Sequence, residues 1–313
     1  MKPIAMQILM GLALALSVII PHRTLAAGPE PVDLKSAAHF AILAGPSITS
    51  TSGGAIDGDV GVSPGNTFTP GTPPVTINGT LHLADSLSLQ AKNDLITAYT
   101  NAEGRTSPTL VAGGALGSLT LPPGLYKDDG APVSLGLTGT LTLDAAGDPN
   151  AVWIFQSAST LIAEANSSVV LTHGAQARNV FWQVGSSATL RTGVIFKGTI
   201  MALSAITLET LVTLEGLALA RNEAVTLDNA SISLPTPEAP RFTRISRTAA
   251  DSATVVLSTT PYFLMTLEAR PDLLLTNWTT IAAEIPVARL WTNTDSTATA
   301  IVTQRFYRAF ISR

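Results

Sequence analysis

Residues 179–235 read NVFWQVGSSATLRTGVIFKGTIMALSAITLETLVTLEGLALARNEAVTLDNASISLP, and this stretch decides the fold. A short pattern, Thr-Leu-charged-Thr/Asn, begins at Thr189 and returns at Thr207 and Thr226, after 18 and then 19 residues. A repeat of this length is too short for two packed helices. It suits one turn of a β-solenoid, in which each coil stacks on its neighbour. The stretch therefore predicts stacked β coils.

The pleat of a strand gives each repeated position a direction, because alternate residues point to opposite sides. Aliphatic residues flank the first threonine of every repeat and predict an inward core. The threonines themselves predict an outward column, with a charged column beside it. The inward columns are Ala188, Ile206, Val225 and Leu190, Leu208, Leu227; the outward columns are Thr189, Thr207, Thr226 and Arg191, Glu209, Asp228.

The composition excludes several classes of protein. The chain has 313 residues, enough for one large domain or two smaller ones, and its 46% of hydrophobic residues is too high for a disordered chain. A net charge of -4 gives no electrostatic footprint for binding nucleic acid. The chain has no cysteine, which excludes disulfides and thiolate metal sites.

The first 27 residues have the layout of a secretory signal peptide. Lys2 precedes an apolar run at 8–20, and the small residues Ala26 and Ala27 follow. A retained membrane anchor is the alternative, but the run is short for a span. We expect this segment, 1–27, to be removed and the protein to be secreted. No later stretch is apolar enough for a membrane span in the mature chain.

After the leader, short strands alternate with glycine- and proline-rich turns. Strands are predicted at 40–44 and 47–51, followed by turn-rich sequence at 57–65 and a loop at 66–74. Further β pattern occupies 119–126 and 135–143, and an aromatic strand at 151–156 is echoed at 179–183. We expect the large aromatic side chains to be buried there.

One stretch, 84–103, is helical instead. Its small and apolar residues recur at helical spacing, Asp85 can cap the start, and Gly104 can end it. A helix with one apolar stripe needs a surface to cover, so we expect it to lie along the flank of the solenoid. The predicted stripe is Leu87, Ala91, Leu95, Ala98 and Ala102, with Tyr99 beside it.

The last quarter of the chain differs in composition. A proline-rich segment at 235–240 predicts an extended linker. Residues 241–313 then hold eight Arg against five Asp and Glu. Strand-like runs at 254–257, 263–268, 278–282 and 305–311 predict a small, separate antiparallel β module.

The chain from about residue 34 to residue 234 resembles the ice-binding-like family of secreted microbial antifreeze proteins. The matching stretches are 40–45, 58–65, 98–99, 104–106, 119–126, 135–145, 147–156 and 179–233. The resemblance implies a mainly β fold: a discontinuous right-handed parallel β-helix of triangular cross-section, with one long α-helix packed along it. The predicted solenoid domain thus spans 28–234.

The resemblance also implies a function, which is adsorption to ice and restraint of its growth and recrystallisation. The partner would be the ice crystal surface, bound by one flat face of the β-helix, with no cofactor, metal or catalytic residue required. Carried onto this chain, that face would hold Thr49, Thr51, Thr189, Thr192, Thr207, Thr210, Thr226 and Asn229.

The sequence departs from the family pattern at its charged column. Arg191 and Glu209 stand where family members have small or neutral residues, and 162–164 replaces threonine-rich sequence. Arg191 and Glu209 would be neighbours on adjacent coils and could form an exposed ion pair. Charged side chains roughen a flat face and hold liquid-like water. The alternative function is therefore an extracellular adhesin or matrix protein that uses the same β-helix as a rigid spacer.

An enzyme is the third possibility, since parallel β-helices also carry glycan-active sites. Asp57 with Asp59 and Asp144 with Asp148 are the candidate acid pairs, but each lies in or beside a glycine-containing turn that it can cap. The histidines after the leader show no metal-ligand spacing. The sequence therefore favours a protein that is not an enzyme.

The predicted C-terminal module resembles the short β domains that end many secreted bacterial proteins. The residues that match are 267–269, 277–281 and 305–308. This resemblance implies attachment to a cell surface, a partner or a polysaccharide, and the excess of arginine would favour an anionic surface.

Overall fold

A computed structural model describes residues 28–130, 134–237, 240–249, 252–258, 264–271, 277–284, 290–296 and 305–312. The predicted signal peptide, 1–27, and residues 238–239 of the predicted linker lie outside the described residues. No helix in the described part of the chain is long and apolar enough to cross a membrane.

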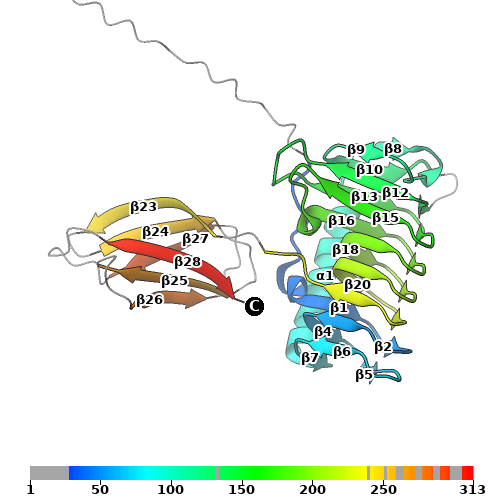
Figure 1. Ribbon diagram of the computed structural model, residues 1–313, viewed down its shortest axis with the longest axis horizontal. Coiled ribbons are helices and arrows are strands. Elements are labelled where there is room, and N and C mark those ends of the chain that lie inside the picture. Colours follow the sequence, from blue (N-terminus) through cyan, green and yellow to red (C-terminus); the bar gives the residue numbers. More distant parts are fainter. Residues whose placement is uncertain are drawn as a thin grey trace, which may run out of the picture.

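Residues before the linker form a parallel β-helix, as predicted (Figure 1). One of its faces is a seven-stranded parallel sheet, which we call the threonine face. In spatial order its strands are β11 (Leu135–Leu137), β14 (Leu161–Ala163), β17 (Ala188–Leu190), β19 (Ile206–Leu208), β21 (Val225–Leu227), β2 (Ser47–Ser50) and β5 (Thr67–Thr69).

The other two faces share one larger sheet. Strands β18 (Ile195–Ala202) and β20 (Thr213–Ala220) turn the corner between them, because their two halves pair with different neighbours. The helix face contains β8 (Thr109–Val111), β10 (Gly124–Asp128), β13 (Trp153–Ser157), β16 (Val180–Val184), β1 (Phe40–Ala44), β4 (Asp59–Val62) and β7 (Leu81–Leu83); the third face contains β9 (Thr120–Leu121), β12 (Thr140–Asp144), β15 (Ser168–Thr172), β22 (Ser231–Ser233), β3 (Ala55–Asp57) and β6 (Thr76–Asn78).

The order of the coils in space differs from their order in the sequence. The N-terminal strands β1 to β3 pair with β20, β21 and β22, so the first coil stacks beneath the last one. The chain then returns along the solenoid as a helix and begins again at β8, at the opposite end (Figure 1). We call the junction between the last and first coils the seam; it confirms a discontinuous β-helix.

Helix α1 (Ser86–Glu103) packs on the helix face, as its stripe predicts. Asp85 caps it by accepting a hydrogen bond from the Ser88 N–H at 2.8 Å. The prediction for Leu87 was wrong, because its side chain is 59% exposed while Ser88 is buried. At 3.6 residues per turn the buried stripe begins at Ser88, and Leu87 is rotated off it. The short 3₁₀ helices are η1 (Lys35–His39), η2 (Ala112–Gly114) and η3 (Ala177–Asn179).

The core of the solenoid contains a stack of aromatic rings across successive coils. Phe155 lies on Trp182 with ring centroids 4.1 Å apart and an interplanar angle of 10°. Tyr126 continues the stack on one side and Phe196 on the other, at 5.4 and 4.8 Å. Offset stacking of this kind adds to the stabilisation by area burial alone.

Two predictions about the N-terminal region were wrong. The turn-rich segment 57–65 contains strand β4, and the loop predicted at 66–74 contains strand β5. Short strands flanked by glycine and proline carry weak local signals, and pairing with β1 and β2 makes them strands.

The C-terminal region forms two three-stranded antiparallel sheets, which confirms the predicted antiparallel β structure. Val255, Leu257, Met265, Leu267 and Trp291 form its core. Two strands, β23 and β27, were not predicted. The strands are β23 (Arg241–Ala249), β24 (Ser252–Ser258), β25 (Leu264–Arg270), β26 (Thr279–Glu284), β27 (Leu290–Asp295) and β28 (Phe306–Ser312).

Candidate functional site

The threonine face presents one outward residue from most of its short strands and two from β2 and β5. In the first six strands the residues on either side, such as Ile48 and Ser50 around Thr49, are buried, so the residue between them must point outward; Thr69 joins through its pairing with Thr49. The strand register places these middle residues in one continuous column. In spatial order the column is Gly136, Ile162, Thr189, Thr207, Thr226, Thr49 and Thr69.

Five consecutive members of this column are threonines. Neighbouring strands lie about 4.7–4.9 Å apart, so the hydroxyl and methyl groups repeat at that spacing. Threonine is branched at Cβ, which restricts its χ1 angle and makes the row stiff. The arrangement is a straight, rigid array of small amphipathic groups on a flat sheet.

The seam divides this column. Thr226 and Thr49 pair across it, although they lie near opposite ends of the sequence of the solenoid domain. The sequence repeat alone identifies Thr189, Thr207 and Thr226, whereas the resemblance supplied Thr49. Thr69 was missed because its strand was predicted to be a loop. The alternation of Thr67, Phe68 and Thr69 was the available signal.

The other four predicted site residues lie at the corner that follows the threonine face. Thr51, Thr192, Thr210 and Asn229 all come after the last residue of their strands. Three of their hydroxyls are engaged within the protein. Thr192 donates to Glu209, and both Thr210 and Thr51 donate to Asp228. Asn229 has a φ of 45° and its backbone N–H donates to the Ser52 carbonyl across the seam.

The prediction of an ion pair between Arg191 and Glu209 is wrong. Arg191 Nε lies 3.3 Å from the Glu164 carboxylate, on the coil at its other side. Glu209 Oε2 instead accepts hydrogen bonds from the Thr192 N–H at 3.0 Å and from its hydroxyl at 3.2 Å. A backbone donor and a hydroxyl on the same residue offer the carboxylate two bonds at little entropic cost.

Asp228 makes the densest contacts at this corner. Its Oδ1 accepts from the hydroxyls of Thr51 and Ser52, both at 2.7 Å, and its Oδ2 accepts from Thr210. The bond from Thr210, followed by those from Thr51 and Ser52, holds the pKa of Asp228 below its usual value. Two members of the predicted charged column, Glu209 and Asp228, accept hydrogen bonds within the protein. The third, Arg191, forms an exposed ion pair with Glu164.

The carboxylates of the candidate acid pairs accept hydrogen bonds within turns and from neighbouring coils. Asp57 accepts from the Asn78 amide at 3.1 Å, and Asp59 from the Thr80 N–H at 2.8 Å. Asp144 accepts from the Ala146 N–H at 2.8 Å and contacts His173, which lowers its pKa. Within the described residues, no group of three His, Asp or Glu side chains could hold a metal ion.

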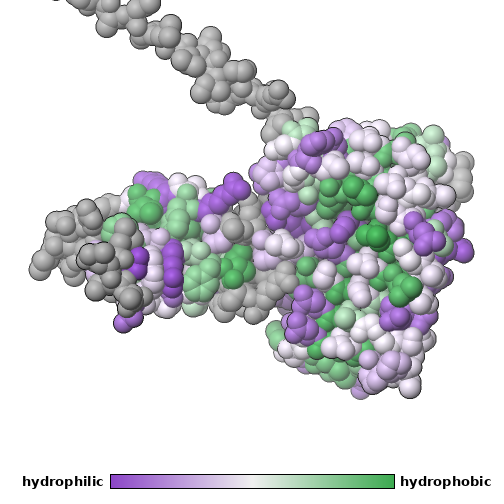
Figure 2. Space-filling view, viewed as in Figure 1, coloured by the Kyte–Doolittle hydropathy of each residue, from purple (hydrophilic) through white to green (hydrophobic). Residues whose placement is uncertain are grey.

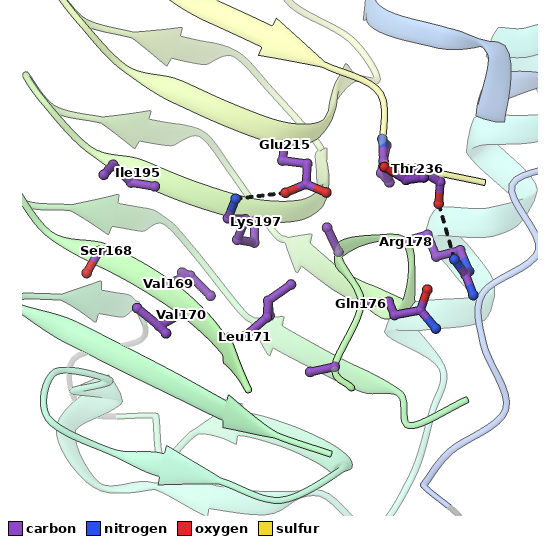
Figure 3. A pocket seen from close by; sticks show the side chains of 13 residues that line it. Ser168, Val169, Val170, Leu171, Gln176, Arg178, Ile195, Lys197, Glu215 and Thr236 are labelled. Atoms are coloured by element: carbon purple, nitrogen blue, oxygen red, sulfur yellow. Dashed lines mark hydrogen bonds and ion pairs between the residues drawn. The ribbon is translucent and has the colours of Figure 1, made fainter. Parts of the chain in front are cut away.

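A groove of about 550 Å³ opens on the third face (Figure 3). Val170, Leu171 and Ile195 give it an apolar floor, and Figure 2 shows apolar residues between hydrophilic ones on this side of the solenoid. Among the described residues that line it, Glu215 is the one acidic side chain, and Lys197 binds it at 2.7 Å. The groove therefore does not present the two carboxylates that glycoside hydrolysis uses.

Known proteins resemble the solenoid part of the chain. The profile of the Ice-binding-like family matches residues 42–233. An ice-binding protein of Nostoc sp. (strain HG1) is 46% identical over 201 residues, which cover 64% of this chain and 73% of that protein. Ice-binding protein K1-A of Typhula ishikariensis is 35% identical, over 61% of this chain and 85% of its own length.

Solved structures of similar proteins share the fold. The crystal structure of an ice-binding protein from an Antarctic biological consortium has a TM-score of 0.64 and 46% sequence identity, and the match covers 67% of this chain and 94% of that one. A glycosylated ice-binding protein from an Arctic yeast has a TM-score of 0.60 and 32% identity, over 69% of this chain and 99% of that one.

Proposed function

The chain belongs to the ice-binding-like family, and on this basis we propose that it adsorbs to ice through the threonine face and thereby inhibits ice growth and recrystallisation. The observation that carries the proposal is the column of five stacked threonines, Thr189, Thr207, Thr226, Thr49 and Thr69, on a flat parallel sheet.

The physical chemistry of ice suits such a column. Ice presents a rigid, periodic lattice, so a binder gains most when its own groups are already ordered and equally spaced. A threonine methyl orders the water around it, and the hydroxyl anchors that water. Each contact is weak, and the affinity comes from many contacts that form together with little further loss of entropy. Neither a catalytic residue nor a cofactor is needed for this function.

The proposed layout has four parts. Residues 1–27 form a signal peptide that directs secretion, 28–234 form the ice-binding β-helix, 235–240 form a linker, and 241–313 form a separate β module. The family match ends at residue 233, which supports a boundary there. The module would attach the protein to a cell surface or a polysaccharide, and its eight Arg against five Asp and Glu favour an anionic one.

Inhibition of ice recrystallisation by the purified protein tests the proposal. Thr207→Tyr places a large ring in the middle of the column and should abolish most of the activity, because the face is no longer flat. The matched control is Thr213→Tyr, at an exposed position that pairs with Ile195 and Ser231 on the third face. The control should keep the parent activity.

Two results would contradict the proposal. Loss of activity in Thr213→Tyr but not in Thr207→Tyr would move the ice-binding surface to the third face. An inactive parent protein that is fully folded by circular dichroism would remove the ice function, and the adhesin or matrix function would replace it.

A further inference from the structure

The acidic side chains beside the threonine column follow a rule along the stack. The carboxylate in the third position of one repeat accepts a hydrogen bond from the hydroxyl in the fourth position of the preceding repeat. Glu209 does this with Thr192, and Asp228 does it with Thr210. The pattern Thr-Leu-acid-Thr thus encodes contacts between coils as well as the strands themselves.

Asp228 extends this contact across the seam. Its second oxygen accepts from Thr51 and Ser52, which belong to the N-terminal coil. The carboxylate therefore joins three coils: the one above it, its own, and the one below the seam. Two backbone hydrogen bonds cross the seam beside it, from the Thr51 N–H to the Leu227 carbonyl at 2.9 Å and from the Asn229 N–H to the Ser52 carbonyl at 2.7 Å.

These contacts also fix the side chains that make them. A hydroxyl held by a carboxylate sets the χ1 angle of its threonine, and the methyl on the same Cβ is then fixed as well. Without Asp228, the Thr210 hydroxyl would lose this acceptor, and the Thr51 hydroxyl would keep only the Leu227 carbonyl at 3.3 Å. Hydrogen bonds to a charged acceptor are stronger than neutral ones, so one carboxylate can order several threonines.

We propose that Asp228 is a positioning residue of the ice-binding surface: it fixes the methyl groups of Thr51 and Thr210 and holds the N-terminal coil in register beneath the last one. The inference rests on the proposed ice function, because it treats these threonines as part of that surface. Glu209 does the same for Thr192. These carboxylates therefore order the corner beside the flat face, which the sequence suggests they roughen.

The ion pair of Arg191 with Glu164 is the natural control. It lies at the same corner, and its two side chains are 49% and 46% exposed. It occupies equivalent positions on neighbouring coils, since the Arg191 N–H bonds to the Ala163 carbonyl just as the Glu209 N–H bonds to that of Leu190. An exposed pair of this kind stabilises little.

The test compares four variants in ice recrystallisation inhibition and in amide hydrogen exchange of the ice-free protein. Asp228→Asn removes charge and one acceptor. Thr210→Ser keeps the hydroxyl and removes the methyl, whereas Thr210→Val keeps the methyl and removes the hydroxyl. The double variant Glu164→Gln with Arg191→Gln removes the exposed pair.

For Asp228→Asn we expect exchange at the Thr51 and Asn229 amides to become roughly tenfold faster, as the loss of one charge-assisted hydrogen bond implies. Exchange at the Arg191 amide should not change, and a several-fold higher protein concentration should be needed to inhibit recrystallisation.

Thr210→Ser should leave exchange unchanged yet weaken inhibition, which a purely structural role would not produce. Thr210→Val should speed exchange at the seam. The double variant should match the parent in both measurements.

Unchanged activity in Asp228→Asn would overturn the proposal, and so would an equal loss in the double control. If the parent itself does not inhibit recrystallisation, the proposed function fails first. Amide hydrogen exchange then tests only whether Asp228 holds the two coils together at the seam. Faster exchange at Thr51 and Asn229 in Asp228→Asn supports this contact, and unchanged exchange refutes it.

Discussion

Gly198 turns the chain from the third face to the helix face in the middle of β18. Its φ is 105°, and a Cβ atom there would lie 2.6 Å from the Val180 carbonyl oxygen. Backbone in this region strains any other residue, and the close oxygen leaves no room for a side chain. The sharp corner of the solenoid at this coil depends on a residue without a side chain.

We expect Gly198→Ala to lower the free energy of unfolding by about 1–3 kcal/mol, the usual cost of a strained backbone conformation. Chemical denaturation followed by circular dichroism measures the change. Gly136→Ala is the control, because a Cβ at Gly136 meets nothing within 4 Å. Equal stability of the two variants would show that the coils can reshape this corner.

Lys92 is a buried cation whose titration should be visible in the stability of the protein. Its Nζ donates to the carbonyls of Ala220 and Arg221, both at 2.5 Å. Burial, and then the charge of Arg221, lowers the pKa of Lys92 to about 8. Between that value and the ordinary 10.5, the unfolded chain binds more protons than the folded one. Stability should therefore rise with pH in this window.

The expected contribution is up to about 1.4 kcal/mol per pH unit between pH 8 and pH 10. Tyr99 has a pKa raised by burial, and this opposes the rise only above its ordinary value of 10.0. Lys92→Met keeps the length of the side chain and should remove the slope. If denaturant midpoints of the parent and of Lys92→Met follow the same pH dependence from 8 to 10, Lys92 does not titrate there.

At the scale of elements, helix α1 is attached to the solenoid by both apolar and polar contacts. Ala91, Leu95 and Ala98 are buried against the helix face. Gln156 Nε2 reaches the last turn and donates to the carbonyls of Ala102 at 2.7 Å and Glu103 at 3.1 Å. These contacts add a side-chain donor at the helix end, where the last carbonyls lack the regular i+4 partner.

The start of α1 depends on Asp85. Loss of an N-cap costs about 1 kcal/mol, so we expect Asp85→Ala to lower the unfolding free energy by roughly that amount. Asp85→Asn keeps the cap and should cost less, although it weakens the contact with His82 Nδ1 at 2.6 Å. Thermal or denaturant unfolding of both variants measures the difference. Equal losses would indicate that the histidine contact matters more than the cap.

The threonine column also leads to a prediction at the scale of the sheet. Ile162 continues the column beyond Thr189, and it is the first non-threonine member on that side. Ile162→Thr should lengthen the threonine row by one coil and strengthen inhibition of ice recrystallisation, since each additional ordered contact adds to the same binding event. The control is Val170→Thr on the third face, at a side chain that is 40% exposed. A gain in the control alone would place the active surface there.

At the scale of the whole molecule, the complete threonine face lies within the solenoid and takes nothing from the C-terminal sheets. A chain that ends at residue 237 should therefore inhibit recrystallisation as strongly per molecule as the full chain. Any attachment to cells or polysaccharide should be lost with the module. Strong loss of inhibition in the truncated protein, with the solenoid still folded, would show that the module takes part in ice binding.

Local sequence was sufficient for the elements with regular period. The repeat of 18 and 19 residues fixes which side chains of β17, β19 and β21 point inward, because a strand has a period of two and a shift by one would bury the threonines. The Asp85 cap of α1 and its stripe from Ala91 onward are equally local. The family resemblance supplied the residues of the N-terminal coil that no repeat marks.

Tertiary structure decided the remainder. The sequence by itself determined stacked β coils, one flanking helix and an outward threonine column, since these follow from the period of neighbouring residues. Three features appear only in the folded structure: Thr69 lies in that column, Arg191 pairs with Glu164 and not with Glu209, and Asp228 accepts a hydrogen bond from Thr51. The contact of Asp228 with Thr51 links coils distant in the chain, whereas the other two link successive coils through strand pairing. Only the seam brings Asp228 and Thr51 together, through pairing of β21 with β2 that no local period encodes.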